Sequence, residues 1–289
     1  KENIFDNIWI QPAAGDAGGA LGAALALWHI EMGNKREVNP NDSMKGSYLG
    51  SDYSQDQVEK ELLSIGANFE TLNYEDLIKQ TSDNLSEEKA IGWFQGRMEF
   101  GPRALGGRSI LGDPRSDKMQ KTLNLKVKYR ESFRPFAPSI LREDLSNWFN
   151  LDVESPYMLL VANINSGKQV EMTEKEQMLF GIDKLNIKRS EIPAVTHVDY
   201  SARIQTVKPE TNKRYYDLIS KFKEKTGCPV IVNTSFNVRG EPIVNSPTDA
   251  FNCFMGTELD YLVIGNCILD KTKQNISLKR DYKKEFELD

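Results

Sequence analysis

The spacing of hydrophobic and polar residues changes several times along the chain, which predicts alternating helices and strands. Apolar residues at helical spacing indicate helices, and short apolar or alternating runs indicate strands. The expected helices are residues 55–65, 75–81, 212–226 and 246–255. The expected strands are residues 68–72, 90–94, 136–141, 157–164, 196–207, 229–233 and 261–264. This order predicts an α/β or mixed α+β fold.

The first 45 residues have a different character from the rest. Small residues around Asp16 lead into an Ala-rich segment, residues 23–29, whose composition suits a packed helix. Such a helix start could bring backbone amides close to an anion, or Asp16 could simply cap the helix. Residues 34–54 are polar and contain proline and glycine, as connectors do. We expect two parts, residues 1–45 and 46–289.

Composition narrows the class of protein. The 289 residues are 39% hydrophobic and 27% charged, which is typical of a globular chain and not of a disordered one. The longest apolar run, residues 20–30, is too short to span a bilayer. The three cysteines are an odd number without a close pair, which favours a reducing compartment. We expect a cytoplasmic protein without membrane contact and, since the chain does not open on methionine, a fragment of a longer protein.

Positive charge is concentrated in one stretch of an acidic chain. The net charge is -5, yet the stretch from Arg97 to Arg134 has ten basic and four acidic residues. A local excess of this kind favours an anion site over an extended nucleic-acid surface. An ordinary salt-bridged surface is an equally valid interpretation of the charge alone.

Several of these cations lie in glycine- and proline-rich segments that would fix their position. Guanidinium groups bind phosphate or carboxylate oxygens in pairs, and Glu99 could order them as an internal counter-ion. The structural alternative is that the arginines cap helices or bridge acids. The basic residues of interest are Arg97, Arg103 and Arg108 in residues 96–109, and Lys128 and Arg134 in residues 128–138.

Two further polar stretches add candidates. If residues 196–207 form a strand, alternation places five polar side chains on one face, which we expect to be too polar for the core. These are His197, Asp199, Ser201, Arg203 and Gln205. The strand that ends near Asn233 continues into a turn with Ser235 and Asn237, whose hydroxyl and amide groups can bind phosphate. The chain has no P-loop and no nucleophile elbow, and two histidines do not make a zinc site. These residue types favour a site that positions and neutralises anions over one that uses covalent catalysis.

Four stretches, taken in order, closely resemble the C-terminal half of the O-carbamoyltransferases of the nodulation, cephamycin and tobramycin type. They are Q-G-R-x-E-x-G-P-R-A-L-G-x-R-S (95–109), K-x-R-E-x-F-R-P-F-A-P (128–138), H-V-D-x-S-A-R-x-Q (197–205) and N-T-S-F-N-x-x-G-E-P (233–242). The resemblance covers residues 45–272, and residues 1–32 look like the end of the family's N-terminal actin-like domain. It implies a YrdC-like twisted mixed sheet flanked by helices and preceded by a short helical remnant.

The resemblance also implies an activity. In this family the C-terminal domain takes ATP, with Mg²⁺, and carbamoyl phosphate, and makes carbamoyl adenylate. The actin-like domain, with bound Fe or another divalent metal, passes the carbamoyl group to a hydroxyl of a small-molecule acceptor. By motif position, the implied catalytic residues are Lys128, Arg103 and Arg134. The implied nucleotide- and carbamoyl-binding residues are Arg203, Asn233 and Ser235, with Arg97, Arg108, His197 and Asn237 as second choices.

One feature of the family is missing. The family's transfer domain holds its metal with a histidine pair, which this sequence lacks, and Asp16 matches only the late metal-ligating aspartate. We therefore expect a partial reaction, with a metal at Asp16 only in the presence of the missing domain. The alternatives are an RNA-binding YrdC-like module linked to tRNA modification, which the acidic remainder disfavours, and a non-catalytic anion-binding domain. The sequence predicts neither the acceptor, nor the oligomeric state, nor the role of residues 165–192.

Overall fold

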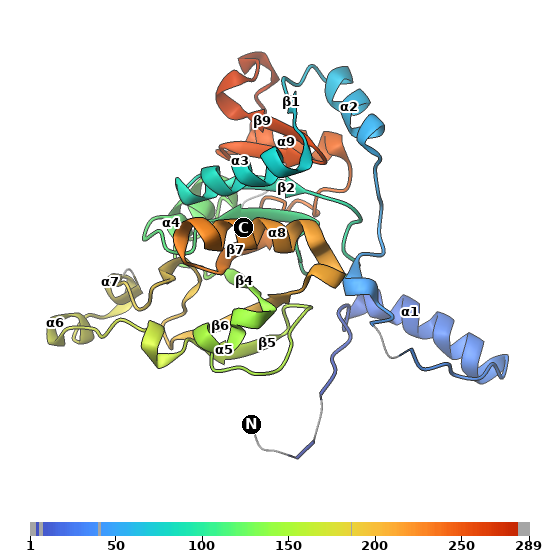
Figure 1. The fold of residues 1–289 in the computed structure, drawn as a ribbon, viewed down its shortest axis with the longest axis horizontal. Coiled ribbons are helices and arrows are strands. Elements are labelled where there is room, and N and C mark those ends of the chain that lie inside the picture. The colour runs from blue at the N-terminus through green and yellow to red at the C-terminus, as the bar shows by residue number, and fades with distance from the viewer. Residues whose placement is uncertain (1–3, 6–7, 40–41, 186, 283–289) are drawn as a thin grey trace.

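A nine-stranded mixed sheet forms the centre of the computed structural model, which describes residues 4–5, 8–39, 42–185 and 187–282 (Figure 1). The strand order is β1-β9-β8-β2-β3-β7-β4-β6-β5. The β2/β8 and β4/β6 pairs are parallel, and the other neighbours are antiparallel. The strands are β1 Glu70–Thr71, β2 Ile91–Phe94, β3 Arg108–Gly112, β4 Ala137–Leu141, β5 Leu160–Asn163, β6 Ser201–Val207, β7 Val230–Ser235, β8 Tyr261–Ile264 and β9 Cys267–Asp270. The expected mixed sheet is confirmed.

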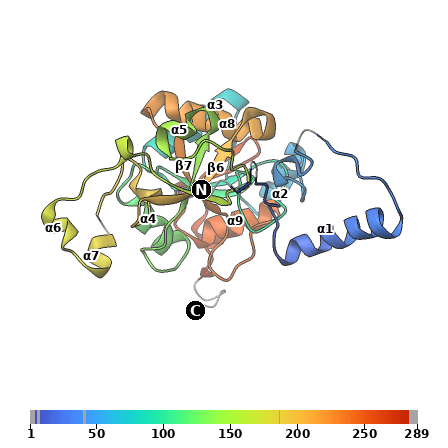
Figure 2. The ribbon, with the colours of Figure 1, turned by 90° about the horizontal axis from the view of Figure 1, so that it is seen from below.

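Helices cover both faces of this sheet, as expected. Figure 2 shows α3 (Tyr74–Ser86), α5 (Leu145–Trp148) and α8 (Pro209–Thr226) on one face, and α4 (Met119–Thr122) and α9 (Pro247–Gly256) on the other. The helix α2 (Gln55–Ser64) packs against α9. Local signals set the helix ends: Ser246 caps α9, and Gly227 ends α8 in the left-handed conformation.

The central strands are buried on both faces. Every residue of β2, β3 and β4 is buried, and Trp93, Ile110 and Ile140 are completely inaccessible. Strands covered on two sides appear in the sequence as continuous apolar runs, which explains why β2 and β4 are predictable. The strand β3 is not, because it opens on Arg108 and Ser109 and ends on Gly112.

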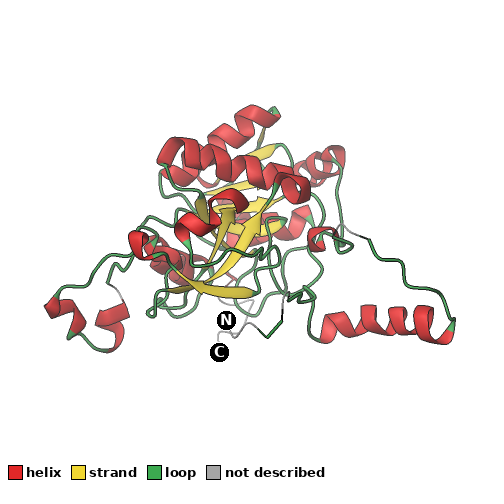
Figure 3. Ribbon diagram, turned by 60° about the horizontal axis from the view of Figure 1, so that its bottom comes forward, coloured by secondary structure: helices red, strands yellow, loops and turns green. Residues whose placement is uncertain are grey.

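Two segments extend from opposite ends of the sheet domain (Figure 3). One contains α1 (Asp16–Ala26) and the turn Leu27–Glu31, neither of which has a buried residue. The other contains α6 (Glu174–Gln177) and α7 (Gly181–Leu185). A helical segment therefore does precede the sheet domain, and the boundary near residue 45 stays a prediction. None of the helices in the described ranges is both long enough and apolar enough to cross a membrane.

The prediction for residues 196–207 is wrong at its start. The strand β6 begins only at Ser201, because residues 197–200 form a tight turn in which the Tyr200 amide donates to the His197 carbonyl at 3.0 Å. His197 and Asp199 therefore do not share a strand face with Arg203. The expectation that this face is too polar for the core is also wrong, since Gln205 is buried with hydrogen bonds at both its amide oxygen and its amide nitrogen.

Candidate functional site

Three strands bring the candidate residues to one edge of the sheet. Ala137 on β4 pairs with Asn233 on β7, and the β4/β6 register that pairs Ser139 with Gln205 places Arg203 level with Ala137. At about 4.8 Å between strands, the Cα atoms of Arg203 and Asn233 lie about 10 Å apart. Because side chains alternate along a strand, one face carries Ser139, Arg203, Gln205, Asn233 and Ser235.

A buried polar network on this face fixes the segment that carries Arg103. The Asn233 Nδ2 donates to the Ala104 carbonyl at 3.0 Å and to the Gln205 Oε1 at 2.9 Å. The Gln205 Nε2 donates to the Leu105 carbonyl at 2.8 Å. By contrast, the Asn233 Oδ1 is buried without a hydrogen-bond partner among the residues that the structure describes. The site therefore presents an open acceptor, which is a costly arrangement unless a ligand fills it.

Glu99 fixes the same segment from its other side. Its carboxylate, which is 7% exposed, accepts the backbone amides of Leu105 at 2.6 Å and Gly107 at 2.7 Å. Gly106 adopts a φ of 104°, and a Cβ there would lie 2.5 Å from the Tyr215 ring. Residues 99–108 are thus a rigid loop whose backbone conformation depends on a buried acid and a glycine.

Arg103 and Arg203 form a pair of like charges at this edge. The Nε atom of each is buried and has no hydrogen-bond partner, and neither forms an ion pair within the described ranges. Burial, and then the charge of Arg103, lowers the pKa of Arg203. Burial also lowers the pKa of His197, and Arg203 adds to the effect while Asp199 opposes it. An anion bound between the two guanidinium groups would neutralise both and satisfy their free N–H groups.

Lys128 lies at the end of β7, next to the same edge. It follows the short helical turn Leu123–Val127 and is only 4% exposed. Its Nζ lies 2.5 Å from the Ser235 carbonyl, 3.1 Å from the Ser235 Oγ, and 2.8 Å from both the carbonyl and the Oδ1 of Asn237. Burial, and then the charge of Arg130, lowers the pKa of Lys128 to about 7. The structure thus brings Lys128, Ser235 and Asn237 into direct contact.

Arg130 lies near Lys128, and Arg134 lies near Arg130. The Arg130 Nε donates to the Asn124 Oδ1 at 2.7 Å, and burial together with Arg134 lowers the pKa of Arg130 to about 10. Arg134 is about half exposed and pairs with Glu131 at 3.0 Å. Arg130 and Ser139 belong to the site but were not predicted as site residues, whereas Gln205 was a candidate as part of the polar strand face. Arg130 could have been predicted, because it follows Lys128 by two residues in the same basic stretch. Nothing in the sequence distinguishes Ser139 as a site residue.

Two predicted arginines lie elsewhere. Ser109 pairs with Ser235, so the neighbouring Arg108 points to the opposite face of the sheet, where it is fully buried. Its NH1 donates to the carbonyls of Gly96 at 2.9 Å and Gly107 at 3.0 Å. These contacts with the backbone indicate a structural role for Arg108. Arg97 is exposed, donates to the Gly50 carbonyl at 3.0 Å, and lines a separate polar cleft of about 510 Å³.

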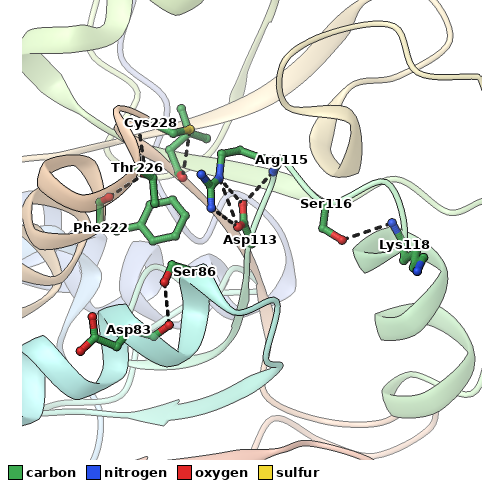
Figure 4. A network of polar contacts seen from close by, with 10 residues as sticks. Asp83, Ser86, Asp113, Arg115, Ser116, Lys118, Phe222, Thr226 and Cys228 are labelled. Carbon is green, nitrogen blue, oxygen red and sulfur yellow. Dashed lines mark hydrogen bonds and ion pairs between the residues drawn. The ribbon is translucent and has the colours of Figure 1, made fainter.

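The salt-bridge interpretation of the basic stretch holds for Arg115. Figure 4 shows its guanidinium group directed at the Asp113 carboxylate, with 2.6 Å between NH2 and Oδ2. The Cζ of Arg115 also lies 5.2 Å from the centre of the Phe222 ring. Only some cations of the stretch thus belong to the candidate site.

Asp16 is the exposed first residue of α1. No cluster of three or more histidine, cysteine, aspartate or glutamate side chains suited to a metal ion occurs in the described part of the chain. One carboxylate does not supply the ligand set of a stable metal site. The residues described here therefore do not fit a resident metal on their own, and the chemistry proposed below does not use one.

Comparison with known proteins identifies the family to which the chain belongs. The family model described as "Carbamoyltransferase C-terminus" matches residues 82–271. An uncharacterized protein of Synechocystis, sll1178, is 56% identical over the whole chain and 48% of its own length. The nodulation protein NolNO of Sinorhizobium fredii is 40% identical over 94% of the chain and 37% of its own length.

A 3'-hydroxymethylcephem-O-carbamoyltransferase of Streptomyces clavuligerus is 30% identical over 91% of the chain and 43% of its own length. The chain thus spans less than half the length of these relatives. The resemblance found in the four motif stretches is confirmed, and the chain belongs to the carbamoyltransferase C-terminal family.

Proposed function

We propose that this chain binds ATP and carbamoyl phosphate and forms carbamoyl adenylate. The observation that carries the proposal is the pair of buried, unpartnered guanidinium Nε atoms of Arg103 and Arg203 at the sheet edge that also holds Lys128. Two polyanions repel each other, so fixed cations are needed to bring them together and to stabilise charge on the transferring phosphoryl group.

The proposed reaction has two steps, and each candidate side chain has a role in it. Water releases phosphate from carbamoyl phosphate and leaves carbamate, and a carbamate oxygen then attacks the α-phosphorus of ATP and expels pyrophosphate. Arg103 and Arg134 bind oxygens of carbamoyl phosphate or the triphosphate, and Arg203 and Ser235 bind nucleotide phosphate. Lys128 stabilises the phosphate at the reacting centre.

Asn233 supplies the contact that recognises the carbamoyl group. Its Oδ1 is a buried acceptor that lacks a partner within the described ranges, whereas its Nδ2 is already hydrogen-bonded. A carbamoyl group carries an amino group whose N–H can donate to this oxygen. This contact would satisfy an acceptor that is otherwise costly to bury.

Transfer to an alcohol is assigned to another part of the protein. The relative from Streptomyces is named for the transfer of a carbamoyl group to a hydroxymethyl cephem, and this chain covers 43% of its length. We expect the adenylate-forming step here and the transfer step in the part of such relatives that lies outside the match.

Pyrophosphate exchange tests the proposal. Labelled pyrophosphate should enter ATP only when Mg²⁺ and carbamoyl phosphate are both present. Lys128→Ala should reduce the exchange by about 100-fold or more, since a fixed charge at the reacting phosphate is lost. The matched control is Lys79→Ala, which removes a lysine that is 67% exposed on α3. Exchange that is independent of carbamoyl phosphate, or undiminished in folded Lys128→Ala protein, would refute the proposal.

A further inference from the structure

The turn behind Lys128 is closed by a carboxylate that was not among the predicted site residues. The Glu241 Oε2 accepts the Val238 amide at 2.8 Å, and the Glu241 carbonyl accepts the Asn237 Nδ2 at 2.7 Å. Asn237 in turn gives Lys128 two of its four oxygen contacts, at 2.8 Å each. Glu241 therefore fixes the backbone and the side chain that hold the Lys128 ammonium group.

Neutral donors oppose the protonation of this carboxylate, which its burial favours. The Tyr282 hydroxyl and the Cys253 thiol both donate to Glu241. Cys253 is completely buried, and the Tyr282 ring packs so closely on Gly256 that a Cβ there would lie 2.4 Å from it. Burial raises the pKa of Glu241, and these two bonds, the Val238 amide and the nearby charge of Lys128 all oppose that rise.

Glu241 is the acidic neighbour that favours the charged form of Lys128. Arg130 disfavours that form, and the Cys253 thiol, which would favour it as a thiolate, stays protonated because burial raises its pKa. Burial and Arg130 both penalise the ammonium form, and the charge of Glu241 opposes them. Without the charge of Glu241, burial and the Arg130 guanidinium group would both disfavour the ammonium form of Lys128.

We propose that Glu241 is a positioning residue that keeps Lys128 charged and oriented toward the phosphate-binding edge of the sheet. This inference rests on the proposed function, because only a phosphate ligand would require a charged Lys128. The protonation of Lys128 can nevertheless be measured in the protein without any ligand.

The test follows the titration of Lys128 by carbon NMR in protein labelled at lysine Cε, with the Lys128 signal assigned by its loss in Lys128→Ala. The pKa of Lys128 should fall in Glu241→Gln by roughly one unit, as expected for the loss of a unit charge nearby at intermediate dielectric. Glu241→Asp, which keeps the charge, should restore most of the wild-type value. The control Glu258→Gln removes an exposed carboxylate that pairs with Lys126 at 3.0 Å, and it should leave the titration unchanged.

Affinity for carbamoyl phosphate, measured by calorimetry from pH 6 to 9, gives the second readout. Affinity should decline as pH rises through the Lys128 pKa, because the ammonium form is lost, and the decline should begin at lower pH in Glu241→Gln. An unshifted Lys128 titration in folded Glu241→Gln would overturn the inference. If that variant does not fold, Tyr282→Phe should produce a smaller shift in the same direction, and no shift would overturn it. A shifted titration without ligand binding would count against the proposed function alone.

Discussion

Arg103 and Arg108 have opposite surroundings although both lie in the same glycine-rich stretch. The NH1 and NH2 groups of Arg108 donate to several carbonyl groups on one face of the sheet, whereas the Arg103 side chain makes no hydrogen bond within the described residues. The sequence predicted the chemistry of both side chains but not their direction. Direction follows from β3, since alternation sends Ser109 toward the site and Arg108 away from it. A strand that opens on arginine has no apolar pattern to reveal it.

The open acceptor of Asn233 leads to a prediction about ligand choice. Acetyl phosphate differs from carbamoyl phosphate in having a methyl group where the amino group would be, so it leaves the Asn233 Oδ1 unpaired. An unpaired buried acceptor costs about 1–3 kcal/mol, which corresponds to roughly 5- to 150-fold in affinity. Competition between the two compounds, measured by calorimetry, should show this preference for carbamoyl phosphate. Equal affinities would show that Asn233 does not contact the carbamoyl group.

At the scale of elements, the loop of residues 99–108 determines where Arg103 lies. Its backbone is tied to Glu99 and to the network of Asn233 and Gln205. The sequence indicated a glycine-rich loop here and a counter-ion role for Glu99. The structure shows Glu99 accepting backbone amides, and its charge also favours the charged form of Arg108. The β6 prediction failed for a related reason, since the turn before Ser201 depends on contacts that alternation does not report.

Gly106 provides a direct test of this loop. Gly106→Ala places a Cβ against the buried Tyr215 ring at a positive φ, so it should reduce the free energy of unfolding by about 2–4 kcal/mol. The control Gly22→Ala lies on the exposed helix α1, where a Cβ meets no atom within 4 Å. It should leave the main urea transition unchanged. Equal transitions for the two variants would contradict the account of the loop.

At the scale of the whole molecule, the sheet assembles a cationic site within an acidic chain. The strand order joins β7, β4 and β6 although their sequence positions are far apart. These pairings place Arg203, Asn233 and Ser235 on one face of the sheet, where Ser235 contacts Lys128. The resemblance of the four motif stretches placed these residues in one family pattern, and their binding roles stay a prediction. It ranked Arg97 and Arg108 as second choices but did not indicate that Arg108 faces the other side of the sheet, because strand register decides which cations meet.

Calorimetric titration with ATP and with carbamoyl phosphate tests this convergence most directly. The proteins compared are the wild type, Lys128→Ala, Arg203→Ala and the exposed control Lys79→Ala. Lys128→Ala should bind both ligands, and Arg203→Ala should bind ATP, about 10- to 100-fold more weakly, because each loses a charge-assisted contact of about 1.5–3 kcal/mol. The control should bind like the wild type. Wild-type affinities in folded Lys128→Ala and Arg203→Ala proteins would show that these cations do not form one binding site.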